Sequence, residues 1–105
     1  MTMLTLDGNA VEVNDEGFFL HPEQWHESMV PELARGEGID AVTDRHWTVI
    51  RHVRHEYEAN GTGPAVRALS KGSGVPTKEL FELFPKGPAK VAARIAGIPK
   101  PRGCI

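Results

Sequence analysis

The sequence predicts a mainly helical domain with a small N-terminal β element: a β-hairpin, a bundle of about five helices and a flexible C-terminal arm. Three observations predict this fold. The turn signal Asp7-Gly8-Asn9 separates two short segments in which apolar and polar residues alternate. Segments with apolar residues at helical spacing follow, divided by glycine and proline. The chain ends in a stretch rich in proline and glycine, which suits neither helix nor strand.

The length of 105 residues fits one domain with a modest core. We predict a single domain over residues 1–97, divided into a hairpin region at 1–20 and a helical bundle at 21–97. Residues 98–105 are predicted to form a mobile arm. The expected strands, including a possible third one, are Met3–Leu6, Ala10–Val13 and Gly17–Leu20.

The first helix is expected to begin at Pro22, because proline is favoured in a first helical turn. Trp25, Met29 and Leu33 follow at intervals of four and should face the core. Pro31 should break or kink this helix, because its ring removes a backbone hydrogen bond.

The clearest helix follows Thr43, a plausible N-cap, and continues to about Asn60. One apolar stripe runs along it, made of Trp47, Ile50, Val53 and Tyr57. Three shorter helices are expected after it: residues 64–69, a segment capped by Thr77, and a segment from Pro88 to about Ala96, with a loop at 71–76 before the second.

The net charge of −2 conceals a strong gradient along the chain. Residues 1–42 hold nine acidic residues and one base, whereas residues 86–105 hold five bases and no acid. Such asymmetry bears on partners more than on fold, and two solvated surfaces would also explain it. No apolar run is long enough to span a bilayer, and the N-terminus does not resemble a signal peptide. The single cysteine excludes an internal disulfide, so we expect a reducing, cytoplasmic location.

Cys104 is the main candidate for chemistry, because a cysteine behind two prolines and a glycine is poorly placed for packing. A thiolate is the reactive form, and nearby cations favour it. Five bases could supply this support, three of them at intervals of four that would share one helical face. They are Lys86, Lys90, Arg94, Lys100 and Arg102. An inert cysteine at a frayed terminus is the alternative.

Arg51, Arg54 and Arg67 are either surface residues or parts of a basic pocket near the arm. The histidines lack acids or cysteines at a recognised metal-ligand spacing, so we interpret them as polar helix surface. They are His21, His26, His46, His52 and His55. We expect no metal or cofactor, and no phosphate-binding loop or serine-hydrolase motif occurs.

The C-terminal third contains three specific stretches: Leu83-Phe84-Pro85-Lys86-Gly87-Pro88-Ala89-Lys90, then Ala96-Gly97-Ile98-Pro99-Lys100-Pro101, then Gly103-Cys104-Ile105. This pattern resembles the signature of the TusE/DsrC/DsvC sulfur-relay family. It extends upstream through Glu37-Gly38-Ile39, His46-Trp47, Val53-Arg54, Tyr57 and Pro64-Ala65-Val66-Arg67, and so covers nearly the whole chain.

This resemblance implies a persulfide carried on Cys104 by a sulfurtransferase-type protein. It also implies protein partners, namely a sulfur-donor complex and a tRNA-thiolating or sulfite-reductase-type enzyme, with nucleic acid involved only indirectly. Dissimilatory members have a second arm cysteine eleven positions before the penultimate one, where this chain has Ala93. The loop Lys71–Pro76 also looks short beside an insertion common in those members. Both departures favour a TusE-like role in tRNA 2-thiouridine synthesis.

Two alternatives remain open. A single-cysteine DsrC-like protein could have a binding or regulatory role in dissimilatory sulfur metabolism. A helix-turn-helix nucleic-acid binder is a weaker alternative, because the net charge of −2 is unusual for such a domain.

Overall fold

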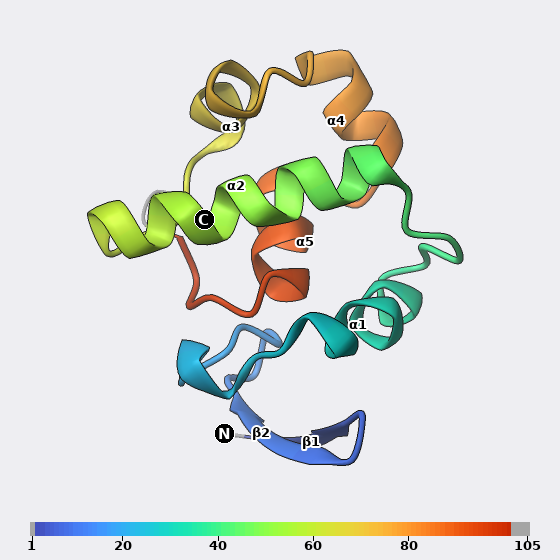
Figure 1. Ribbon diagram of the computed structural model, residues 1–105, viewed down its shortest axis with the longest axis vertical. Helices are drawn as coiled ribbons and strands as arrows, with labels where there is room; N and C mark the ends of the chain where they lie inside the picture. The colour runs from blue at the N-terminus through green and yellow to red at the C-terminus, as the bar shows by residue number, and fades with distance from the viewer. Residues whose placement is uncertain (1, 102–105) are drawn as a thin grey trace.

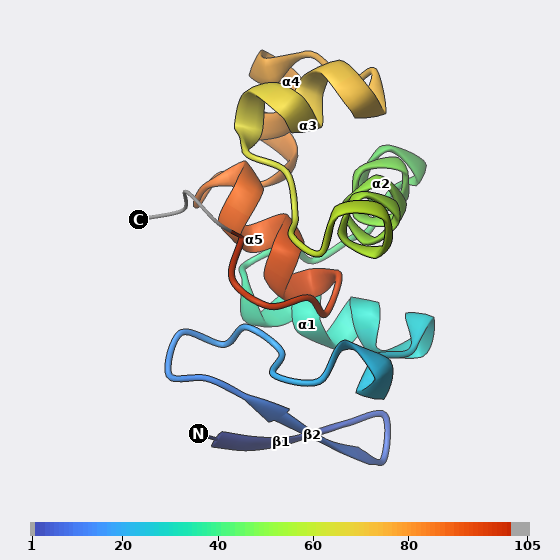
Figure 2. The ribbon, with the colours of Figure 1, turned by 90° about the vertical axis from the view of Figure 1, so that its left-hand side faces the viewer.

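The computed structural model describes residues 2–101. Its elements confirm the predicted class, with a two-stranded antiparallel sheet followed by five α-helices. Figures 1 and 2 show the hairpin at one end of the molecule, α3 and α4 at the other, and α5 between them. The α-helices are α1 (Val30–Gly36), α2 (Asp44–Asn60), α3 (Val66–Ser73), α4 (Thr77–Leu83) and α5 (Pro88–Ile95).

The hairpin forms where the alternation and the turn residues place it. Strand β1 (Thr2–Leu6) pairs with β2 (Asn9–Val13), and the register sets Leu4 opposite Val11. Asp7 and Gly8 take positive φ angles of 49° and 77°, as the tight turn requires. The possible third strand is reduced to an isolated bridge between Val13 and Phe19.

The segment after the hairpin differs from the prediction. Two 3-10 turns, η1 (Pro22–Gln24) and η2 (Glu27–Met29), replace the start of a continuous helix. Pro31 does not break a helix but occupies the first turn of α1, where its missing N–H costs nothing. The expected helix start at Pro22 therefore marks a 3-10 turn, and Trp25 lies outside any helix.

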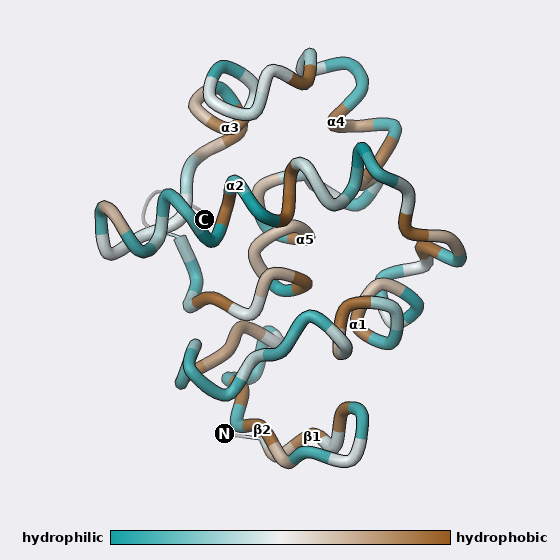
Figure 3. The backbone as a smooth tube through the Cα atoms, viewed as in Figure 1, coloured by the Kyte–Doolittle hydropathy of each residue, from teal (hydrophilic) through white to brown (hydrophobic). Residues whose placement is uncertain are grey.

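The long helix α2 begins as predicted at its Thr43 N-cap and ends at Gly61 with a φ of +76°. Figure 3 shows hydrophilic and hydrophobic residues alternating along it. The helix α3 begins two residues later and ends four residues later than the predicted segment 64–69, so the first half of the predicted 71–76 loop, up to Ser73, is helical.

Helix α5 occupies the centre of the core. It contacts each of the other four α-helices. Six of its eight residues are buried: Pro88, Ala89, Val91, Ala92, Ala93 and Ile95. A second, smaller core under the hairpin contains Leu6, Val11, Val13, Phe19 and Met29. Trp25 and Leu33 pack against both cores and so connect the hairpin to the bundle.

The packed body extends beyond the predicted boundary at Gly97. Ile98 is fully buried in the main core and Pro101 is buried as well, while Pro99 and Lys100 are half-buried. The part of the predicted arm that the structure describes, residues 98–101, therefore lies against the domain.

Candidate functional site

Cys104 and Arg102 lie outside the described residues, and the segment that leads to them is the described part of the site. We call residues Ile95–Pro101 the arm root. Cys104 follows Pro101 by three positions, and a stretch of three residues spans at most about 11 Å. The position of Pro101 therefore limits where the thiol can act.

Trp25 binds the start of the arm root. Its indole N–H donates a hydrogen bond of 2.8 Å to the carbonyl oxygen of Ile95, seventy residues further along the chain. The ring also lies directly against the backbone of Gly97, where an added Cβ would overlap Trp25 Cδ1. Gly97 has a φ of +68°, a left-handed conformation that also favours glycine.

Arg54 of α2 binds the next carbonyl groups. Its Nη1 donates to the oxygen of Ala96 at 2.7 Å and to that of Gly97 at 3.4 Å. Its Cζ lies 4.2 Å from the centroid of the Trp25 ring, a cation–π distance. Partial burial lowers the pKa of the Arg54 guanidinium from its usual value, and the nearby Glu58 and Tyr57 oppose that shift. Of the three arginines considered for a basic pocket, Arg54 thus touches the arm root.

The far end of the arm root packs against the loop between α2 and α3. A Cβ added to Gly63 would lie 2.5 Å from Ile98 Cδ1 and 3.3 Å from Pro101 Cγ. Gly63 itself is buried. Glycine is therefore needed at position 63 for close approach of the arm root.

Two of the bases expected near the thiol pair with N-terminal carboxylates. Arg94 makes a bidentate ion pair with Glu37, with N–O distances of 2.7 and 3.0 Å. Lys100 Nζ lies 3.0 Å from Glu16 Oε1. Bases from the basic C-terminal region thus pair with carboxylates from the acidic N-terminal region.

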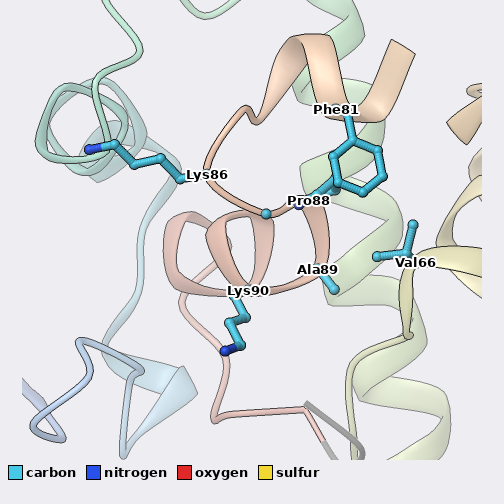
Figure 4. A pocket seen from close by; sticks show the side chains of 7 residues that line it. Val66, Phe81, Lys86, Pro88, Ala89 and Lys90 are labelled. Atoms are coloured by element: carbon cyan, nitrogen blue, oxygen red, sulfur yellow. The ribbon is translucent and has the colours of Figure 1, made fainter. Parts of the chain in front are cut away.

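Lys86 does not lie on the predicted helical face, because it precedes the first residue of α5, whereas Lys90 and Arg94 are four residues apart within that helix. Lys86 and Lys90 line an open pocket of about 310 Å³ together with Val66, Phe81, Gly87, Pro88 and Ala89. Figure 4 shows the two lysine side chains extending in different directions, away from the cluster of Phe81, Pro88 and Val66. The half-exposed Phe81 ring makes this pocket apolar with basic margins.

Arg51 and Arg67 have other surroundings. Arg51 lies over the Trp47 ring at 4.9 Å and within 3.5 Å of Glu27 on the surface. Arg67 is exposed near the start of α3. The structure does not gather the three arginines into one pocket.

His46 is buried, which corrects its interpretation as polar surface. Its Nδ1 accepts a hydrogen bond from the backbone N–H of Thr43 at 3.0 Å, so its Nε2–H donates to the Leu83 carbonyl at 3.0 Å.

Within residues 2–101, no group of three or more His, Cys, Asp or Glu side chains is arranged to hold a metal ion. No helix in this part of the chain combines the length and apolar character needed to cross a membrane.

Trp25 is the residue at the arm root that the sequence did not identify as functional. Its spacing with Met29 and Leu33 indicates a core residue, and the sequence does not show which group accepts a hydrogen bond from its indole N–H. A buried tryptophan N–H requires an acceptor, but the acceptor here is a backbone carbonyl far away in sequence.

Comparison with known proteins gives consistent results for sequence and fold. A family model described as DsrC-like protein matches residues 5–105. The chain is 40% identical to the gamma subunit of dissimilatory-type sulfite reductase from Nitratidesulfovibrio vulgaris, over the full length of both proteins. It is 42% identical to the sulfurtransferase TusE of Pectobacterium atrosepticum, over 98% of this chain and all of that protein.

Solved structures agree with these matches. The crystal structure of dissimilatory sulfite reductase I contains a chain with a TM-score of 0.89 and 40% identity, covering 99% of this chain and all of the other. The NMR structure of Allochromatium vinosum DsrC has a TM-score of 0.85 and 35% identity, over 98% and 97% of the two chains.

These matches overturn the argument from loop length. The gamma subunit aligns over 105 positions that cover all of both chains, so it has no insertion relative to this protein. The TusE alignment extends over 110 positions and so places gaps in this 105-residue chain. A short loop before Pro76 therefore does not distinguish this chain from a dissimilatory protein.

Proposed function

Because this chain belongs to the DsrC-like protein family and is a sulfur-relay protein, we propose that it carries a persulfide on Cys104. The observation that carries this proposal is the position of its single cysteine. That residue is penultimate in a chain that matches the family model to its last residue. A cytoplasmic location, where a free thiol stays reduced, is part of the proposal.

The proposed reaction moves one sulfur atom without net oxidation. The Cys104 thiolate attacks the outer sulfur of a donor persulfide R–S–SH. A new S–S bond forms between Cys104 and the outer sulfur, the S–S bond of the donor persulfide breaks, and R–S⁻ leaves. An acceptor thiolate then attacks the outer sulfur of Cys104–S–SH in the same way, which regenerates the Cys104 thiolate.

The alanine at position 93 favours a protein that transfers its persulfide sulfur to an acceptor on another protein. Ala93 is fully buried in α5, at the position where the family resemblance implies a second cysteine in dissimilatory members. With no other cysteine in the chain, the Cys104 persulfide cannot be resolved by an internal disulfide. We therefore propose transfer to an enzyme of tRNA 2-thiouridine synthesis, with a sulfurtransferase complex as donor.

Persulfide formation can be tested by intact-protein mass spectrometry. Incubation with a persulfide donor should add one sulfur atom, about 32 Da, to wild-type protein. The Cys104→Ser variant should gain nothing. An absent adduct, or an equal adduct on the variant, would contradict the proposal.

The full-length match to a sulfite reductase gamma subunit supports a second candidate function. In that case the protein would bind a dissimilatory sulfur enzyme through its C-terminal end. Persulfidated protein should be offered separately to a 2-thiouridine-forming enzyme with its tRNA and to a purified sulfite reductase. Cys104-dependent 2-thiouridine in the digested tRNA supports the first candidate. Stable binding to the reductase, without thiolated tRNA, supports the second.

A further inference from the structure

The C-terminal end of α5 is already capped by its own backbone. Gly97 N–H donates to the Arg94 carbonyl at 3.3 Å, and Ile98 N–H donates to the Ala93 carbonyl at 3.2 Å. With Gly97 in the left-handed conformation, these two bonds make a Schellman motif, which suffices to end a helix. The side chains that bind this region therefore add something that helix termination does not need.

Those side chains come from other elements of the fold and bind three consecutive carbonyl groups. Trp25 donates a hydrogen bond to the carbonyl oxygen of Ile95, and Arg54 donates to those of Ala96 and Gly97. A second Arg54 nitrogen, Nη2, lies 3.4 Å from the Pro22 carbonyl, so the guanidinium also fixes the loop that carries Trp25. A cation at a helix C-terminus is favourable, because the helix dipole places negative charge there.

The outcome is a fixed path for the chain after Gly97. Trp25 and Arg54 hold its start, and the close approach of Ile98 and Pro101 to Gly63 holds its end. Pro101 is thereby held beside Gly63 in the α2–α3 loop. Gly63 lies three residues before Val66, which lines the pocket of Figure 4. The hairpin lies at the opposite end of the molecule from α3 (Figures 1 and 2).

We propose that Trp25 and Arg54 are positioning residues for Cys104, which hold the arm root so that the thiol is presented on the Gly63 side of the molecule. The two residues act through the backbone of residues 95–101 and do not touch the sulfur. This inference rests on the proposed function only for the role of Cys104. The geometry of the arm root stands without it.

The single cysteine makes the proposal directly testable, because a nitroxide can be attached at Cys104 without other changes. Paramagnetic relaxation enhancement of backbone amides then reports where the label spends its time. In the wild type, the enhancement should be strong from Gly63 to Val66 and weak in the hairpin. In Arg54→Met this contrast should be lost, and Arg54→Lys, which keeps one charged donor, should restore part of it.

Arg51→Met is the matched control, because Arg51 lies on the same helix and over a tryptophan ring but does not touch the arm root. It should keep the wild-type pattern. If Arg54→Met does not fold, Trp25→Phe decides, since it removes the indole N–H and keeps an aromatic ring beside Arg54. A wild-type pattern in a folded Arg54→Met or Trp25→Phe protein would overturn the proposal.

The experiment is independent of sulfur chemistry. A protein that shows the expected label pattern but forms no persulfide would contradict the proposed function and leave the positioning role intact. A protein that forms the persulfide but shows no contrast between the Gly63 side and the hairpin would do the reverse.

Discussion

At the scale of single residues, Gly97 is subject to two constraints that can be separated. Its φ of +68° is unfavourable for any other residue, and its Cα lies against the Trp25 ring. Gly61 has a similar φ of +76°, but a Cβ there would meet nothing within 4 Å. Gly61→Ala should therefore cost about 1–2 kcal/mol, the price of a left-handed L-residue.

Gly97→Ala should lose about 1–3 kcal/mol more than Gly61→Ala, because the added methyl group must also displace the indole. Urea denaturation of both variants measures the difference in the free energy of unfolding. Equal losses would mean that Trp25 yields to the methyl group and does not hold the arm root tightly.

The ion pair between Arg45 and Glu79 predicts a dependence on pH. Two hydrogen bonds of 2.7 Å from Arg45 hold the pKa of the Glu79 carboxyl below its usual range. Because this pKa is lower in the folded state, the pair stabilises the fold at pH values above the unfolded pKa of about 4.3. That contribution is lost as the pH falls through the folded pKa.

Wild-type protein and Glu79→Gln should therefore differ in unfolding free energy at neutral pH and converge below about pH 4. Chemical denaturation at several pH values measures this difference. High salt at pH 7 should also reduce it, because both side chains are partly exposed to solvent. A difference that stays constant from pH 7 to pH 3 would be inconsistent with the pair as its source.

At the scale of secondary-structure elements, His46 joins α2 to the end of α4. It completes a capping box with Thr43 through Nδ1, and it binds the Leu83 carbonyl through Nε2–H. His46→Ala loses both bonds, which we expect to cost about 2 kcal/mol. His46→Gln should lose about half as much, because glutamine is an ordinary residue for the capping box but is not expected to reach Leu83 as well.

Thermal or urea unfolding of the two variants, with Thr43→Ala as the control for the cap alone, tests this division. Thr43→Ala should cost about 1 kcal/mol. If His46→Gln is as unstable as His46→Ala, the bond to Leu83 carries the whole effect and the capping role of His46 is wrong.

The sequence was sufficient to predict elements whose signals are local. The hairpin turn, the Thr43 cap and the start of α5 at Pro88 depend on residues adjacent in the chain. The segment from Pro22 to Leu33 was mistaken for one kinked helix, because an interval of four residues also arises when successive 3-10 turns bury one side. Periodicity alone does not distinguish these cases.

The candidate site was predictable only in part, because its contacts join distant segments. Cys104 was identified from its position in the sequence, and Arg54 was a candidate for a basic pocket. That Arg54 binds carbonyl groups 42 and 43 residues away, with Trp25 as its neighbour, depends on how α2 crosses α5. Likewise, Arg94 and Lys100, two of the bases expected around the thiol, pair with Glu37 and Glu16, which only the folded chain brings to them.

At the scale of the whole molecule, the arm root decides where the stable domain ends. Ile98 is fully buried in the core around α5, and Lys100 is joined to Glu16 in the N-terminal region. A chain that ends at Gly97 loses all of these contacts. A chain that ends at Pro101 keeps every contact described above.

We therefore expect removal of residues 98–105 to cost at least the 2–5 kcal/mol typical of deleting one buried isoleucine side chain. That loss is a large part of the roughly 5–15 kcal/mol that stabilises a domain of this kind. Removal of residues 102–105 keeps Ile98 and Lys100 in place and should cost less than removal of residues 98–105. Ile98→Ala in the full-length chain separates the loss of core packing from the loss of chain length, and it should account for most of the larger effect. If the chain ending at Gly97 were as stable as the wild type, the arm root would be an appendage and would not hold Cys104 in place.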